Sequence, residues 1–146
     1  MNRELIATTS ISIYASPSEV WKALIDPDII KEYMHGTETL TTWELHSPVI
    51  FRGEWEGVPY VDKGVVVEII PERVLGYSYW SPLSGTEDFE DNYSIITYHI
   101  SPYDDETTLT VTQDNLEDDD KVIRLEENWM KTLTHLKQIL ESKKHK

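Results

Sequence analysis

The sequence has 146 residues, of which 39% are hydrophobic and 10% aromatic, a composition that excludes a disordered chain and predicts one folded domain over residues 1–146. It contains no cysteine, which excludes disulfide bonds and thiolate chemistry. The formal net charge of −14 is the opposite of the basic balance that binds phosphate backbones and anionic membranes, so we expect no nucleic-acid partner and no membrane partner.

The sequence also bears on location. The segment MNRELIATTS has no apolar core followed by a small-residue cleavage site, so we expect no secretory signal. No apolar run approaches the ~20 residues that a membrane-spanning helix needs. We therefore expect a cytoplasmic protein.

The first predicted elements are a strand and two short helices. Residues 5–14 end in an alternation of Ile11 and Ile13, which is the period of a β-strand. The next segment, SPSEVWKALIDPD, changes to helical spacing. Its apolar stripe consists of Val20, Trp21, Leu24 and Ile25.

The ends of these helices carry capping signals. Ser16 is a good N-cap, Pro17 suits the first helical position, and Glu19 completes a capping box. Asp26 and Pro27 then end this helix and begin a second one. The buried side of the second helix is predicted to hold Ile29, Ile30, Tyr33 and Met34.

A series of short strands joined by turns follows, which is typical of an antiparallel meander. One strand is expected to alternate Val49, Phe51, Gly53 and Trp55 on one face. The predicted strands cover residues 40–45, 48–57, 60–70, 74–80, 92–100 and 107–115. The connection over residues 81–91 is long for a hairpin and carries four acidic residues, so it is either a rim or lid over an opening or a solvated loop.

The last of these strands, TTLTVTQDN, raises a question. Leu109 and Val111 alternate with threonines, and the same face continues to the amide of Gln113. Either the strand ends in solvent there, or the amide faces a space that is not filled. Three tyrosine hydroxyls on the same predicted face, which are easier to place around a cavity than in a dry core, favour the second alternative: Tyr77, Tyr79 and Tyr98.

A long amphipathic helix is predicted from about residue 120 to 142. Its acidic start and its lysine-rich end both suit the helix dipole. The apolar stripe steps by three or four residues through Val122, Leu125, Trp129, Leu133, Leu136 and Leu140.

These elements predict an α+β fold in which a sheet with one apolar face is covered by one long helix. Four segments carry a family resemblance in their order along the chain: ISIYASPSEVWKALIDPD, GVVVEIIPERVLGYSYWSPLSG, TTLTVTQDN and ENWMKTLTHLKQILE. Together they resemble the helix-grip SRPBCC superfamily, also called START-like or Bet v-like, and within it the activator-of-heat-shock-protein-ATPase homologues. The resemblance implies a curved antiparallel sheet wrapped around a long C-terminal α-helix, with two short helices after the first strand.

The resemblance also implies a cavity between sheet and helix, which holds lipids, hormones or polyketides in related families, but it implies no shared catalytic motif. We therefore expect a binding protein for a small, largely apolar molecule. Gln113 would orient a polar group of the ligand, and Met34 would lie at the mouth. Apolar contacts would come from Phe51, Trp55, Tyr79, Tyr98 and Trp129.

Two alternative functions stay open. One is an interaction module that co-regulates a chaperone ATPase, and a homodimer is compatible with either reading. The other is a cyclase-like or hydratase-like enzyme that uses the same cavity. We expect no inward Asp, Glu or His on the best-defined strands, which counts against the enzyme, and we expect His99 to be exposed. The histidines have no metal-ligand spacing, so we expect neither a metal nor a cofactor.

Overall fold

The computed structural model describes residues 2–144. One seven-stranded antiparallel sheet has the order β1-β7-β6-β5-β4-β3-β2. The strands are β1 (Ala7–Ile13), β2 (Glu38–Leu40), β3 (Pro48–Trp55), β4 (Val58–Ile70), β5 (Val74–Tyr79), β6 (Ser94–Tyr103) and β7 (Glu106–Gln113). The helices are α1 (Pro17–Ile25), α2 (Pro27–Tyr33) and α3 (Asp119–Lys144), with single 3₁₀ turns η1 (Pro82–Ser84) and η2 (Glu90–Asn92).

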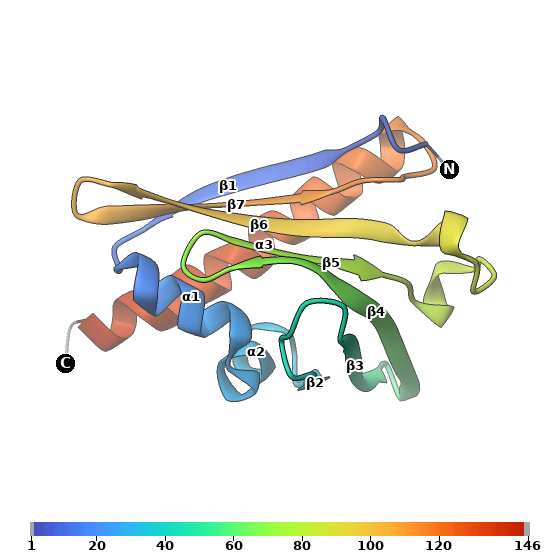
Figure 1. Ribbon diagram of the computed structural model, residues 1–146, viewed down its shortest axis with the longest axis horizontal. Helices are drawn as coiled ribbons and strands as arrows, with labels where there is room; N and C mark the ends of the chain where they lie inside the picture. The colour runs from blue at the N-terminus through green and yellow to red at the C-terminus, as the bar shows by residue number, and fades with distance from the viewer. Residues whose placement is uncertain (1, 145–146) are drawn as a thin grey trace.

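The arrangement is the predicted helix-grip α+β fold. Figure 1 shows α3 running lengthwise along the sheet, with α1 and α2 below β1, β7 and β6 in this view and α2 near β2. Because β1 pairs with β7, the first and last strands lie side by side. The helix α3 packs mainly against β1. No helix within residues 2–144 is long and apolar enough to cross a membrane.

The predicted capping signals are confirmed at both short helices. The Ser16 side chain accepts a hydrogen bond from the Glu19 amide at 3.1 Å, and the Glu19 carboxylate accepts one from the Ser16 amide at 3.1 Å. Asp26 caps α2 by accepting from the Asp28 amide at 2.9 Å. These caps satisfy amides that a helix leaves unpaired, and they fix where the chain leaves β1 and enters the helices.

The prediction of a strand over residues 40–45 is wrong. The strand β2 ends at Leu40, and Trp43 has a φ of 58°, a left-handed conformation that cannot continue a strand. The Trp43 indole donates to the Ile25 carbonyl at 2.8 Å. This bond holds the segment against the end of α1 instead of in the sheet.

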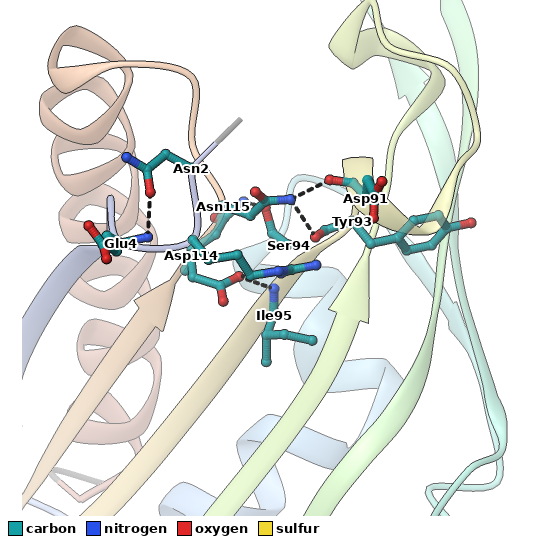
Figure 2. Close-up of polar contacts among 10 residues, drawn as sticks. Asn2, Glu4, Asp91, Tyr93, Ser94, Ile95, Asp114 and Asn115 are labelled. Atoms are coloured by element: carbon teal, nitrogen blue, oxygen red, sulfur yellow. Dashed lines mark hydrogen bonds and ion pairs between the residues drawn. The ribbon is translucent and has the colours of Figure 1, made fainter.

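The predicted loop between β5 and β6 is anchored at several points. Asp88 in its middle pairs with Lys63 of β4, and the Trp80 indole donates to Thr86 at 3.1 Å. At its end, Asn115 donates to the carbonyls of Asp91 at 2.7 Å and Tyr93 at 3.0 Å, as Figure 2 shows. These contacts hold the loop to the ends of the neighbouring strands, which favours the predicted rim over a freely solvated loop.

Candidate ligand-binding site

A pocket of about 620 Å³ lies between the sheet and the N-terminal half of α3. Its walls come from the end of α2, the strands from β3 to β7, the loop after β5, and α3. Ser81 and Leu83 of the anchored loop are part of the lining, so this loop contributes to the rim of the pocket.

The pocket exists because the two halves of α3 pack differently. Leu133, Leu136 and Leu140 in the C-terminal half are all less than 5% exposed and belong to the core. In the N-terminal half, Leu125 and Trp129 of the same apolar stripe are only partly buried and line the pocket. A twisted sheet cannot follow a straight helix along its whole length, so a gap opens at one end.

Gln113 lies inside the protein, as the alternation of β7 predicts, and only 8% of it is exposed. Its Oε1 accepts a hydrogen bond from the Trp129 indole at 3.0 Å, and its Nε2 donates to the Ser94 hydroxyl at 3.5 Å. The amide therefore links β7 to α3 at the floor of the pocket. Both of its polar atoms already have partners within the protein.

Six of the seven predicted ligand contacts line the pocket. Trp55, expected on the buried face of β3, is 57% exposed because it stands at the end of the strand, where it meets the ring of His35 edge-on at 6.4 Å between centroids. Tyr98 is the exception and lies behind the lining. The six lining residues are Met34, Phe51, Trp55, Tyr79, Gln113 and Trp129.

A chain of aromatic rings forms the apolar wall. Phe51 contacts Tyr77 at 5.4 Å between ring centroids, and Tyr77 contacts Tyr98 at 6.3 Å. Tyr98 in turn meets the ring of Trp129 edge-on at 5.8 Å. The first two pairs are tilted and the last is edge-on, and inclined rings at such distances attract one another. Tyr98 thus supports Trp129 from behind, while Tyr77, which was not among the predicted contacts, reaches the pocket.

The structure corrects one prediction about charge: an acidic side chain does face inward. Asp62 of β4 is 7% exposed and lines the pocket. Its Oδ2 accepts a hydrogen bond from the Tyr79 hydroxyl, and its Oδ1 has no hydrogen-bond partner among the described residues. The expected absence of an inward carboxylate is therefore wrong and no longer counts against an enzyme, although His99 is exposed as predicted.

A second polar pair lies on the same wall. The hydroxyls of Tyr60 and Thr37 are 2.6 Å apart, and the Thr37 hydroxyl also donates to the Met34 carbonyl at 2.6 Å. Sequence reasoning missed Tyr60 and Thr37, since neither lies on a segment whose face the alternation identified. Both residues line the pocket together with Asp62.

Burial keeps the inner phenols protonated. It raises the pKa of Tyr77 to about 12, and the hydrogen bond with Tyr98 only partly offsets this rise. The pKa of Tyr79 is raised well above its ordinary value, first by burial and then by the Asp62 carboxylate. Burial likewise raises the pKa of Tyr98, with the neighbouring Tyr77 adding to the rise. At neutral pH these groups are neutral hydroxyls that can donate or accept hydrogen bonds.

Metal binding has no geometric support within residues 2–144, where no three His, Asp or Glu side chains group as metal ligands would. The site is a pocket with one aromatic wall and with carboxylates and hydroxyls elsewhere in its lining.

The fold and the pocket define the class of the protein: a helix-grip domain with a pocket between the sheet and the C-terminal helix. The family described as "Activator of Hsp90 ATPase homolog 1-like protein" matches residues 14–141, and the chain belongs to this family. The resemblance drawn from the sequence is thereby confirmed. A comparison with curated proteins gave no significant match.

Several solved structures are similar to the chain. ChR145 from Cytophaga hutchinsonii is 37% identical over 100% of both chains, with a TM-score of 0.86. The Aha1 dimer from Colwellia psychrerythraea is 18% identical over 93% of this chain and 96% of that one, with a TM-score of 0.73. CalU16 from Micromonospora echinospora is 18% identical over 91% of this chain and 74% of that one, with a TM-score of 0.72. At 18% identity, the last two show the fold alone.

Proposed function

We propose that the protein binds a small, largely apolar molecule in the pocket between the sheet and α3. The observation that carries this proposal is the partial burial of Leu125 and Trp129, whose apolar stripe is buried in the core further along the same helix. A bound apolar molecule would complete that burial. The volume of about 620 Å³ is within the roughly 300–1,000 Å³ of small-molecule sites.

A titration with the neutral apolar dye Nile red tests this proposal. We expect saturable, stoichiometric binding with increased fluorescence. Leu125→Trp should narrow the pocket and weaken dye binding while the protein stays folded. The matched control is Ile123→Trp, because Ile123 is 54% exposed on the same helix and lies outside the lining. A wild-type protein that leaves the dye unbound, or equal dye binding by Leu125→Trp, contradicts the proposal.

The identity of the ligand is best sought in protein purified from its own host. Native mass spectrometry should show a second species heavier than the 17.0 kDa chain by one small molecule. The species should be less abundant after Leu125→Trp than after Ile123→Trp, which makes the observation specific to the pocket.

Membership of the family supports a second candidate function, the regulation of an Hsp90-type chaperone ATPase in the cytoplasm. A pull-down against the chaperone of the host would test it, and no association at micromolar concentration would remove this candidate. The similar Colwellia structure is a dimer, so a homodimer is also proposed, and light scattering of the purified protein would decide this point.

The pair formed by Asp62 and Tyr79 supports the third candidate, a cyclase-like or hydratase-like enzyme, because a carboxylate and a phenol meet at the wall of the pocket. Incubation of a co-purified molecule with fresh protein would test it. Recovery of that molecule with its mass and isomeric form unchanged would leave binding without catalysis.

A further inference from the structure

The polar wall of the pocket contains an acceptor that the protein leaves unsatisfied. Asp62 is 7% exposed, lines the pocket, and uses one carboxylate oxygen to accept from Tyr79. The other oxygen, Oδ1, has no partner in the described part of the chain. An ionised carboxylate can accept about four hydrogen bonds, and a buried one that lacks partners is costly to the folded state.

The neighbouring hydroxyls cannot supply the missing donor. The single proton of Tyr79 is directed at Asp62 Oδ2. The Thr37 proton is directed at the Met34 carbonyl, so the 2.6 Å contact between the Thr37 and Tyr60 hydroxyls must use the Tyr60 proton. Each hydroxyl has one proton to donate, so this wall offers acceptors from Asp62, Tyr60 and Tyr79.

The only basic groups of the lining in the described structure are Lys121 of α3 and His35, which follows α2. None of the ion pairs found in residues 2–144 joins Lys121 to Asp62. Glu54 adds a second carboxylate to the lining. An anionic ligand would therefore have to avoid the Asp62 wall, whereas a cationic or hydroxylated ligand would be attracted to it.

We propose that the ligand is amphipathic: an apolar body lies against Phe51 and Trp129, and a head group that donates hydrogen bonds, a hydroxyl or a protonated amine, binds the Asp62 carboxylate. This inference rests on the proposed function and narrows its ligand class. It assigns to Asp62 the role that the sequence suggested for Gln113, whose amide is already bonded to Trp129 and Ser94. It also predicts that a fatty-acid carboxylate binds less well than these two head groups.

A head-group series on one alkyl chain tests the proposal: decylamine, decanol and decanoate compete with Nile red for the wild-type protein. We expect decylamine, decanol or both to displace the dye at concentrations about tenfold or more below those needed for decanoate, as charge-assisted bonding requires. Displacement of the dye by decylamine alone would show that the preferred head group is a cationic donor. Equal displacement by decanol would show that a neutral hydroxyl is sufficient. Decanoate competing as well as the other two would overturn the proposal.

Two variants test whether Asp62 causes the preference for decylamine over decanoate. Asp62→Asn should reduce the advantage of decylamine over decanoate by about tenfold. The matched control is Asp104→Asn, which makes the same charge change at an exposed turn outside this pocket and should leave the preference unaltered. A preference that survives Asp62→Asn overturns the assignment. If that variant does not fold, the wild-type series decides alone.

The result also separates the two proposals. Nile red binding without any head-group preference would contradict only the role of Asp62. Absence of Nile red binding would contradict the binding function and this inference together.

Discussion

At the scale of single residues, Gln113 shows what an alternating strand can and cannot predict. The period of β7 predicts that its side chain faces inward, and the amide is indeed buried. The sequence does not reveal its partner, because Trp129 lies 16 residues further along the chain on a different element. A pattern within one strand carries no information about which helix residue is opposite.

Replacing Gln113 with Leu should destabilise the protein. The substitution removes the acceptor of the Trp129 indole N–H at a buried position. An unpaired buried donor costs about 1–3 kcal/mol, and we expect a loss of that size in the free energy of unfolding, measured by chemical denaturation.

A double-mutant cycle separates this bond from changes in packing. Trp129→Phe removes the indole N–H, so Gln113→Leu should cost less in that background than in the wild type. Equal costs in the two backgrounds would show that the bond adds nothing to stability.

The buried tyrosines predict how the protein responds to alkali. Folding raises the pKa of four tyrosines above the ordinary value of 10.0. The pKa of Tyr77 rises to about 12, and the pKa values of Tyr33, Tyr79 and Tyr98 are raised as well. Because the folded state favours the protonated phenol, the stability is fully present below about pH 10 and is lost as the pH rises towards 12. The residues concerned are Tyr33, Tyr77, Tyr79 and Tyr98.

Absorbance at the wavelength of tyrosinate, followed together with circular dichroism, measures this effect. The buried phenols should ionise only as the secondary structure is lost. Ionisation of all tyrosines in one step near pH 10 with the fold intact would contradict the burial described above.

At the scale of elements, the sequence predicts the position of α3 well. It does not predict how the two halves of this helix pack against the sheet. The three- and four-residue spacing predicts the helix and its apolar stripe, and both are confirmed. Leu125 and Leu136 are equivalent within that pattern. Only the twist of the sheet, which arises from all strands together, decides that Leu136 is in the core and Leu125 borders a pocket.

The strand β4 explains why Asp62 was missed. Its outward side carries three exposed valines, Val61, Val65 and Val67, so hydrophobicity does not identify the buried face. The pairing with β5 also shifts between Val66 and Glu68, which interrupts the alternation. Where both sides of a strand are apolar and a bulge is present, period two no longer assigns faces.

Alanine substitutions test the different packing of the two halves of α3. Leu136→Ala should cost about 2–5 kcal/mol, because it leaves a cavity in a close-packed core. Leu125→Ala should cost less than about 1.5 kcal/mol, since its side chain is only partly buried beside an existing space. Thermal and chemical unfolding measure both values. Similar losses for the two variants would show that the N-terminal half of α3 is packed as tightly as the rest.

At the scale of the whole molecule, the order of the elements was sufficient to predict the fold, because only one long helix is available to cover the sheet. The ligand could not be predicted in the same way. The polar wall joins Thr37, which follows α2, to Tyr60 and Asp62 of β4 and Tyr79 of β5, and no pattern along the chain brings these four together. A site made by distant elements becomes visible only in the folded molecule.

The net charge of −14 leads to the last prediction, that the protein has no measurable affinity for duplex DNA or anionic vesicles at ~0.15 M salt, where the Debye length is about 8 Å. Several of its basic residues are already paired with carboxylates, including Arg3 with Asp114, Arg52 with Glu38 and Lys63 with Asp88. Binding to phosphates depends on clustered, unpaired lysine and arginine. Fluorescence anisotropy with labelled duplex and vesicle sedimentation would measure this, and binding in either assay that weakens as salt is added would reveal a basic patch large enough to overcome the overall charge.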